Sequence, residues 1–365
     1  MITPKTMKTP KSGKLVVTPG WQTTHGFCSD MLNLYELYSN GATISENLGK
    51  YEFPETMKPL MESLEIGIGE HFGYVFRKDG DISVEEECDI GKNKNVVVAF
   101  SGGKDSVAAA MKFKEMGYNV TAFHLHGINR GLPNEVDHAR EMANSIGVQF
   151  HVENVNVKGG SSWLEHPMKN QLICALVLDW SLANGLGSHI VFGDFLNDYA
   201  STSLFDRNWS DTQEMWNGFT AYIRNYVPGF QIEIPFHTYI DTLDIITANG
   251  TGLLEKTQSC LTLPYRKINL VKGNESKYGV KMLPNRCGSC WKCCVEYIYL
   301  ADSGKVPYNK AFYQHCLEYL KGKMKDEKPF LPKPRNLTDV YVAFLYDVPS
   351  GSHLHEFDND ETKTS

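Results

Sequence analysis

The sequence has no long apolar run, no excess of basic charge and no internal repeat. A membrane-spanning helix needs about 20 consecutive apolar residues, and no segment approaches that length. The first segment, MITPKTMKTPKSGKLVV, also lacks the apolar stretch of a secretory signal peptide. We therefore expect a cytoplasmic protein with no membrane partner.

Basic residues are outnumbered by acidic ones, 36 Lys and Arg against 43 Asp and Glu, which gives a formal net charge of -7. A protein that binds nucleic acid usually presents a basic surface to the phosphates. Nucleic acid is therefore disfavoured as the main partner, although a local basic groove is compatible with this charge.

Cysteine occurs at nine positions, an odd number that does not suit a framework of disulfides. Three of the nine stand close together in CGSCWKC. In a chain of 365 residues this clustering favours a metal site in a reducing compartment.

The composition, 42% hydrophobic and 22% charged, is that of a globular protein with room for more than one module. We predict an N-terminal extension of unknown role over residues 1–95 and a nucleotide-binding α/β domain over residues 96–250. A zinc-binding and helical C-terminal part follows over residues 251–330, and residues 331–365 are expected to form a C-terminal strand and a disordered tail.

Strand and helix patterns alternate from Val96 onwards. Val96–Phe100 is a continuous apolar run, typical of a strand buried on both faces of a parallel sheet, and helical spacing of apolar residues follows it. Further strands are predicted in NVTAFHLHG, VQFHVENV and HIVFGD, with a long apolar helix at Lys169–Gly185 before the last. This order implies right-handed crossovers and predicts a doubly wound parallel sheet.

Between the first strand and its helix the chain reads SGGKDS. Glycine lets backbone N–H groups approach an anion closely, and a helix N-terminus favours negative charge. Lysine adds a countercharge, aspartate a ligand for Mg²⁺, and the two serines add hydroxyl donors. A simple capped helix is the alternative. We predict a phosphate site made by Ser101, Gly102, Gly103, Lys104, Asp105 and Ser106, the last three with catalytic roles.

The cysteine cluster spaces Cys287, Cys290 and Cys293 as Cys-x2-Cys-x2-Cys, and Cys260 in TQSC offers a fourth thiolate. Four sulfurs around Zn²⁺ form a closed, structural site. Unrelated buried cysteines and an iron–sulfur cluster are the alternatives. We predict zinc.

With both motifs in place, the chain resembles the 7-cyano-7-deazaguanine synthase (QueC-like) branch of the PP-loop ATP pyrophosphatases, whose loop signature is Ser-Gly-Gly-x-Asp-Ser. The resemblance rests on SGGKDS, HGINRGLPNE, HPMKNQL, GDFLNDYASTSLFDR, IEIPF and the cysteine motifs, in one order over about residues 96–299. It implies the adenine nucleotide alpha hydrolase-like fold, with ATP and Mg²⁺ as cofactors beside Zn²⁺.

The resemblance implies that ATP adenylates a carboxylate with release of pyrophosphate, and that ammonia then attacks the adenylate. It points to four further residues that would contact the substrate: Glu135, Asn170, Asp194 and Asp198. The first two could instead be helix caps, and the last two ordinary loop acids. The loops that would frame a deazaguanine base differ from the family pattern at His126-Gly127-Ile128 and around Asp241-Thr242.

The expected function is therefore C–N bond formation on a small-molecule carboxylate, as in 7-cyano-7-deazaguanine synthesis. A related activity on a protein or another base in an antiviral or phage system is the first alternative. A tRNA-thiolating enzyme and a non-catalytic ATP- and zinc-binding module are the others, and a homodimer is left open. A sulfonucleotide reductase is disfavoured because its Glu-Cys-Gly-x-His signature is absent.

Overall fold

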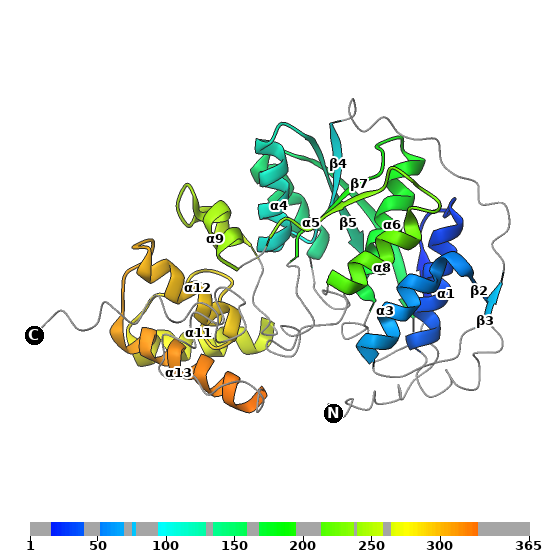
Figure 1. The fold of residues 1–365 in the computed structure, drawn as a ribbon. Coiled ribbons are helices and arrows are strands. Elements are labelled where there is room, and N and C mark those ends of the chain that lie inside the picture. Colours follow the sequence, from blue (N-terminus) through cyan, green and yellow to red (C-terminus); the bar gives the residue numbers. More distant parts are fainter. Residues whose placement is uncertain are drawn as a thin grey trace, which may run out of the picture. The chain divides into compact units, whose positions relative to one another are not determined.

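The structure is a computed structural model that describes residues 16–39, 52–68, 75–77, 94–128, 134–158, 168–194, 213–236, 239–257 and 264–327 (Figure 1). The expected C-terminal strand and tail at residues 331–365 lie outside these ranges, as do Asp198 and Cys260. The described residues form two compact units, and each is treated by itself.

A six-stranded sheet organises the first unit, in the order β1-β6-β5-β4-β7-β8. Every neighbouring pair is parallel except β1 and β6, which are antiparallel. The predicted α/β class with a mostly parallel, doubly wound sheet is confirmed. The strands of this sheet are β1 (Val16–Pro19), β4 (Asn95–Ala99), β5 (Asn119–His126), β6 (Gln149–Lys158), β7 (His189–Phe192) and β8 (Gln231–Glu233).

The strand order places SGGKDS at the kind of position where α/β sheets bind ligands. The chain runs from β4 outwards to β5 and β6, then returns to add β7 on the other side of β4. The strand order therefore reverses at β4, and ligands in open α/β sheets bind outside the carboxyl ends of the strands at such a reversal. SGGKDS follows β4 after a single residue, Phe100, whose N–H donates to the carbonyl of Phe123 at 2.8 Å.

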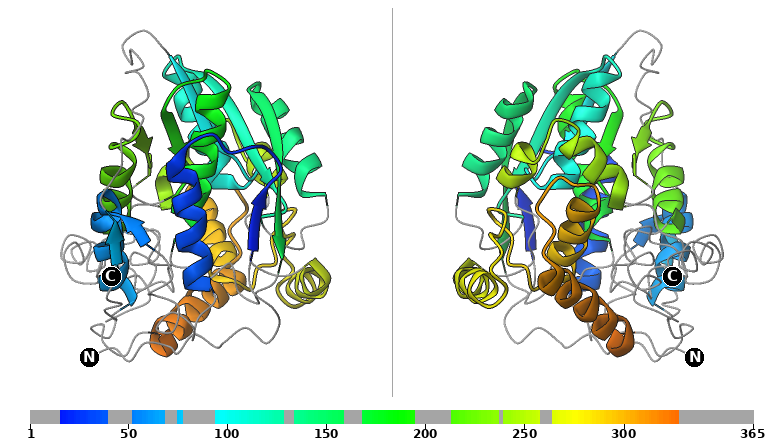
Figure 2. Two further views of the ribbon diagram at one scale, coloured as in Figure 1. Left: turned by 90° about the vertical axis from the view of Figure 1, so that its right-hand side faces the viewer. Right: turned by 90° about the vertical axis from the view of Figure 1, so that its left-hand side faces the viewer.

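The boundary expected at residue 95 does not separate a free-standing extension. β1 pairs with β6 from Val16↔Lys158 to Pro19↔Val155, so it is an edge strand of the main sheet. Helix α1 (Gly26–Ser39) packs on α6 (Lys169–Ala183), as Figures 1 and 2 show, and Phe27 and Met31 belong to the main hydrophobic core. The described part of residues 1–95 therefore completes the first unit by burying apolar surface of the α/β layer.

The remaining elements of the first unit surround the sheet. Helices α4 and α5 lie on one face and α6 on the other (Figure 1). A small two-stranded parallel sheet, β2 with β3, lies apart from the main one. The bounds are β2 (Glu52–Pro54), η3 (Glu55–Met57), α3 (Lys58–Ile68), β3 (Val75–Arg77), α4 (Lys104–Glu115), α5 (Glu135–Ile146) and α8 (Gln213–Ile223).

The second unit is helical and includes Gly102–Ala108, which is the first part of α4 with the two glycines before it. The other described helices of this unit are α9 (Tyr239–Thr247), α10 (Gly252–Lys256), α11 (Pro264–Tyr278), α12 (Trp291–Asp302) and α13 (Lys310–Glu327). Helices α12 and α13 pack together, and α11 contacts α13.

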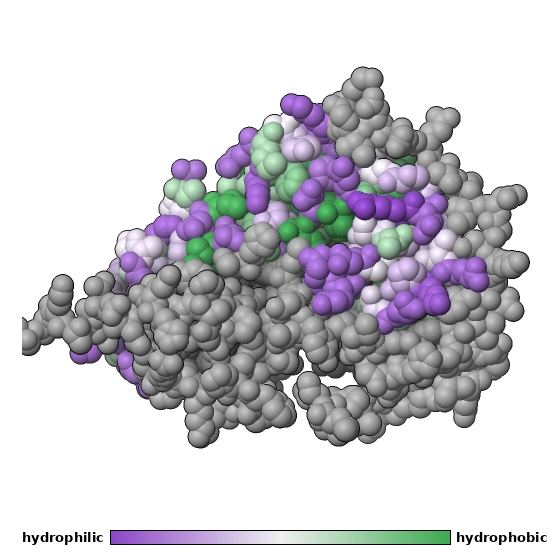
Figure 3. Space-filling view, viewed as in Figure 1, coloured by the Kyte–Doolittle hydropathy of each residue, from purple (hydrophilic) through white to green (hydrophobic). Residues whose placement is uncertain are grey.

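Met116 and Tyr308 are the large apolar side chains that are more than half exposed among the described residues. Figure 3 shows one face of the molecule, and the green, apolar residues on it lie between purple and white ones. None of the helices in the described ranges is long and apolar enough to cross a membrane.

Candidate nucleotide and metal sites

The SGGKDS loop is a glycine turn that leads directly into a helix. Gly102 has φ of 73°, in the left-handed region that favours glycine. Helix α4 begins at Lys104, and the Ser106 hydroxyl donates to the carbonyl of Gly103 at 3.0 Å. This local hydrogen bond is also what a capping turn would form, so the capping alternative describes part of the geometry.

The Lys104 side chain is fully buried, which a capping role alone does not require. Its ammonium group forms an ion pair with the neighbouring Asp105 carboxylate, and its Nζ lies 3.4 Å from Oγ1 of Thr242 on α9. Thr242 also donates a hydrogen bond to Asp105. A buried charge is stable only when paired and hydrogen-bonded, and here two segments of the second unit meet that need.

The pKa values at this pair are both perturbed. Burial lowers the pKa of Lys104, and the attraction of Asp105 and Glu296 works against that effect. Burial alone would raise the pKa of Asp105, but the charges of Lys104 and Lys292 and the hydrogen bonds from Lys104 and Thr242 hold it below its ordinary value. Asp105 is therefore an ionised carboxylate at neutral pH, the hard oxygen donor that Mg²⁺ prefers. Clustered perturbed groups of this kind mark candidate functional sites.

The donor set at the loop fits an anionic oxygen ligand. A helix N-terminus, a lysine and two serines occur within six residues, and each favours a phosphate. Ser101 is exposed, whereas Gly102 and Ser106 are buried. The assignment of Ser101–Ser106 to ATP nevertheless remains a prediction.

The three cysteines of CGSCWKC converge on one point. The Sγ atoms of Cys287, Cys290 and Cys293 are buried and all lie within 4.8 Å of one another. The Cys287 and Cys293 sulfurs are 3.8 Å apart. Zn–S bonds of about 2.3 Å in a tetrahedron separate sulfurs by about 3.8 Å, so this cluster could bind a metal ion of that kind. The fourth predicted ligand, Cys260, lies outside the described residues.

The backbone conformation around Gly288 shapes the turn that holds Cys287, Cys290 and Cys293, which we call the cysteine knuckle. Gly288 has φ of 67°, and a Cβ there would lie 2.7 to 2.9 Å from three neighbouring side chains. The Asn274 side chain donates to the Cys287 carbonyl at 2.8 Å and to Ser289 Oγ at 2.9 Å. Cys290 is the N-cap residue of α12. The neighbouring Cys294 has a raised pKa, first because of its hydrogen bond with Cys316 and then because of burial.

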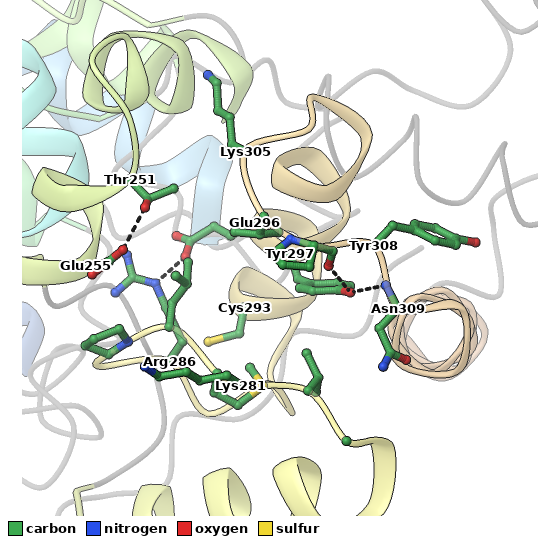
Figure 4. Close-up of a pocket in the computed structure, with 17 residues that line it drawn as sticks. Thr251, Glu255, Lys281, Arg286, Cys293, Glu296, Tyr297, Lys305, Tyr308 and Asn309 are labelled. Carbon is green, nitrogen blue, oxygen red and sulfur yellow. Dashed lines mark hydrogen bonds and ion pairs between the residues drawn. The ribbon is translucent and has the colours of Figure 1, made fainter.

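A buried ion pair lies beside the cluster. Arg286, which precedes Cys287, binds the Glu296 carboxylate of α12. Its other guanidinium nitrogens donate to the carbonyls of Leu254 and Thr257, at 3.1 and 2.8 Å. The two residues of this ion pair, with Cys293, Tyr297 and Asn309, line a cavity of about 510 Å³. In Figure 4 the Arg286–Glu296 pair lies on one side of Cys293, and Tyr297 and Asn309 lie on the other side. The arginine is thus fully paired, as a buried guanidinium must be.

The substrate residues expected from the sequence lie in the first unit. Asn170, in the first turn of α6, donates from its side-chain amide to the Asp194 carboxylate at 3.0 Å. The N-cap of α6 is Met168, without a side-chain cap, so Asn170 is not the cap. Glu135 is buried in the first turn of α5. Asp198 lies outside the described residues, and the substrate role of all four stays a prediction.

Three residues around Lys104 were not anticipated from the sequence: Thr242, Lys292 and Glu296. They are distant in the chain from SGGKDS and belong to no local motif. Lys292 lies within the cysteine motif and Glu296 lies just after it. The cysteine spacing predicted the turn that groups the three thiols, but it did not predict that this part of the chain lies near Lys104. The departure from the family pattern at Asp241-Thr242 was the one available signal.

The family comparison matches this region. Residues 95–171 match the model of the family described as queuosine biosynthesis protein QueC. The matched segment runs from β4 through SGGKDS, β5, α5 and β6 into the first turn of α6. Residues 95–171 are therefore similar to the QueC family model, which confirms the stated resemblance for this segment.

A curated relative matches a shorter part. The tRNA-5-methyluridine(54) 2-sulfurtransferase of Pyrococcus horikoshii is 31% identical over 84 residues, which are 23% of this chain and 27% of that protein. The chain thus matches about a quarter of the length of this relative.

Three solved structures are also similar. A predicted tRNA methyltransferase subunit of Methanocaldococcus jannaschii has 19% sequence identity over 41% of this chain and 72% of that chain, with a TM-score of 0.26. The NMN synthetase of Francisella tularensis has 11% identity over 76% of this chain and 97% of that chain, with a TM-score of 0.30. The NH3-dependent NAD synthetase of Campylobacter jejuni has 10% identity over 74% of this chain and 92% of that chain, with a TM-score of 0.29. TM-scores this low establish no shared fold, so the fold assignment rests on the strand order itself.

Proposed function

We propose that this protein uses ATP to adenylate a carboxylate and then transfers the acyl group to an amine nitrogen. The QueC-type segment at residues 95–171, with SGGKDS at the strand-order reversal, carries this proposal. A carboxylate oxygen attacks the α-phosphorus of ATP and the bond to the β-phosphate breaks, so pyrophosphate leaves. The amine then attacks the activated carbonyl, AMP leaves, and the amine proton passes to solvent.

The loop residues have distinct proposed roles in the first step. The glycine turn and the N-terminus of α4 bind the β- and γ-phosphate oxygens, and Lys104 offsets charge that develops on pyrophosphate. Asp105, held ionised by its neighbours, is the proposed ligand of Mg²⁺. When bound, Mg²⁺ supplies electrostatic stabilisation of the departing phosphates.

The proposed carboxylate is 7-carboxy-7-deazaguanine and the amine is ammonia, which gives the amide. A second ATP then adenylates the amide oxygen with release of pyrophosphate, and loss of AMP and of the amide protons to solvent gives the nitrile. The QueC-type match supports this choice. Asn170 and Asp194, which are hydrogen-bonded to each other, and Glu135 are the proposed substrate contacts, together with Asp198. A protein or another modified base as acceptor is the alternative, because the chain departs from the family pattern at His126-Gly127-Ile128.

tRNA thiolation is the second candidate, favoured by the 31% identity to the Pyrococcus horikoshii sulfurtransferase. Such chemistry requires a reactive thiolate. Among the described cysteines, Cys28, Cys174 and Cys294 have raised pKa values, first by burial in Cys28 and Cys174 and first by the hydrogen bond with Cys316 in Cys294. These three thiols are poor nucleophiles, so thiolation would have to use another cysteine of the chain.

Product analysis tests the first step. Incubation of the full chain with ATP, Mg²⁺, 7-carboxy-7-deazaguanine and ammonium should give AMP and pyrophosphate, and mass spectrometry should detect the amide and then the nitrile. Production of ADP and phosphate would refute adenylation at this loop. Pyrophosphate release with an unchanged deazaguanine would reject the substrate and retain the chemistry.

Matched variants link the activity to the loop. Asp105→Asn and Ser106→Ala should each lower turnover more than about tenfold, the effect of removing one preorganised contact to a developing charge. Asp137→Asn, on the exposed surface of α5, is the control and should be fully active. Wild-type turnover in Asp105→Asn and Ser106→Ala would return the loop to a capping role and would mean that the activity does not depend on these two side chains.

A further inference from the structure

Two histidines and a glutamate meet at the carboxyl end of β5. His124 and His126 end that strand, and Glu135 lies in the first turn of α5, the next helix along the chain. One ligand atom of each residue lies within 4.8 Å of one ligand atom of both others. All three belong to the first unit, whereas the cysteine cluster belongs to the second.

The backbone pattern explains why these residues meet. Alternate residues of a strand point to the same face, so His124 and His126 face one way. Helix α5 packs against β5 and β6, and Figure 1 shows it beside them. Its first turn therefore brings Glu135 to the histidines. His138, one turn further along α5, lies close enough for its charge to act on His124.

The tautomer of His124 leaves one nitrogen with a lone pair. Its Nδ1 lies 2.8 Å from the carbonyl oxygen of Phe100. A carbonyl only accepts hydrogen bonds, so Nδ1 carries a proton; burial lowers the pKa of His124 and favours the neutral ring, in which Nε2 then carries none. Nε2 is buried, on a side chain only 2% exposed, and has no hydrogen-bond partner in the described part of the chain. A histidine that donates one N–H to a backbone carbonyl and presents the other nitrogen is the usual arrangement of a metal ligand.

We propose that His124, His126 and Glu135 bind a divalent transition-metal ion, with Zn²⁺ as the favoured ion and at least one coordination position open to a small ligand. Two imidazoles and a carboxylate suit zinc, whereas Mg²⁺ and Ca²⁺ prefer oxygen ligands alone. Tetrahedral zinc bonds of about 2.1 Å place ligand atoms roughly 3.4 Å apart. Side-chain rotations close the remaining distance from the 4.8 Å limit.

The position of the three residues favours a ligand-binding role over a purely structural one. Parallel α/β sheets bind their ligands at the carboxyl ends of the strands, and both histidines lie at that end of β5. A three-residue ligand set leaves the ion able to accept an oxygen or nitrogen atom of a small molecule. This differs from the cysteine cluster, whose thiolates form a closed site once a fourth ligand is present.

Metal counting in variants of the full chain tests the proposal. The chain is stripped with a chelator, reloaded with Zn²⁺, freed of excess metal and analysed for zinc per chain. Compared with wild type, Glu135→Gln and His126→Gln should each lose about one zinc. Glu141→Gln, an exposed glutamate on the same helix, is the matched control and should lose none. Since the readout is a difference between variants, it does not depend on whether the cysteine cluster is occupied.

A second measurement separates metal binding from folding. Zn²⁺ should raise the Tm of wild type and Glu141→Gln by more than that of Glu135→Gln, since an ion that binds only the folded state stabilises it. Co²⁺ loading should give thiolate charge-transfer absorption of equal strength in all variants, because the cysteines are unchanged. Equal zinc content and equal Tm shifts in folded Glu135→Gln, His126→Gln and Glu141→Gln would overturn the proposal.

Discussion

Asp179 of α6 anchors a segment that is about 155 residues away in the chain. Its buried carboxylate accepts hydrogen bonds from the backbone N–H groups of Thr24 and His25 and from the Trp21 indole, each at 3.0 Å. The His25 Nδ1 lies 2.7 Å from the same carboxylate. These contacts join the connection between β1 and α1 to the central helix of the first unit.

Asp179→Asn should destabilise this anchor by roughly 3 kcal/mol. The Trp21 indole binds one carboxylate oxygen, and the other four donors, the Thr24 hydroxyl among them, share the second. An asparagine keeps one oxygen but presents an NH2 group to the remaining donor, and every retained bond loses its charge. A hydrogen bond to a charged group contributes about 1.5–3 kcal/mol to stability, against about 1 kcal/mol for a bond between neutral groups. Asparagine also avoids the cost of burying a charge, which offsets part of the stability lost with the hydrogen bonds.

The assay is hydrogen exchange at the amides of Thr24 and His25, supported by urea unfolding. Exchange should accelerate about a hundredfold at pH 7, which is the equivalent of roughly 3 kcal/mol. Asp137→Asn, an exposed substitution on α5, is the control and should change stability by less than about 0.5 kcal/mol. Unchanged protection of both amides in Asp179→Asn would refute the anchor.

The pH dependence gives an independent check. Burial alone would raise the pKa of Asp179, but the hydrogen bonds from His25, Trp21 and Thr24 hold it below its ordinary value. A lowered folded-state pKa contributes stability that is present above the unfolded pKa of about 3.9 and lost as pH falls through the folded value. The stability difference between wild type and Asp179→Asn should therefore shrink below about pH 4.

Two further predictions use pairs of glycines. Gly288→Ala and Gly304→Ala both place a side chain at positive φ, 67° and 68°, but of these two glycines only Gly288 has neighbours that a Cβ would meet. In urea unfolding, Gly288→Ala should therefore be more destabilising than Gly304→Ala by about 1–3 kcal/mol, and it should retain less zinc. Equal effects of the two substitutions would mean that the residues around Gly288 are not tightly packed. A Cβ on Gly218 of α8 would lie within 3.0 Å of the α3 backbone, whereas one on Gly273 of α11 meets nothing within 4 Å. Gly218→Ala should therefore lower the free energy of unfolding by about 1–3 kcal/mol and Gly273→Ala raise it by up to about 1, an order that a reversed result would contradict.

The parts of the fold that the sequence predicted are those determined by short-range pattern. Val96–Phe100 is apolar at every position because β4 is covered on both faces, and the glycine turn and α4 follow within a few residues. The cysteine spacing likewise specifies a local knuckle, so Cys287, Cys290 and Cys293 could be grouped before any coordinates were known.

Contacts between distant segments were not predictable in the same way. The four residues of β1 pair with β6, about 140 residues later, and nothing in VVTP specifies that partner. Asn170 and Asp194 were each expected near a substrate, yet their mutual hydrogen bond depends on the register between α6 and β7. His124 and His126 resemble any alternating strand until α5 brings Glu135 against them.

The cysteine cluster and the loop lysine are connected through one helix of the second unit. Cys290 is the N-cap of α12, and Lys292 and Glu296 follow in the next turns, where their charges act on Lys104 with opposite sign. Arg286, just before the first cysteine, holds Glu296 in a buried ion pair. A metal ion bound by Cys287, Cys290 and Cys293 would therefore suit this position: it would fix where α12 begins, and hence where these charges lie, while its soft ligands would not compete for the Mg²⁺ that the oxygen donor Asp105 would bind.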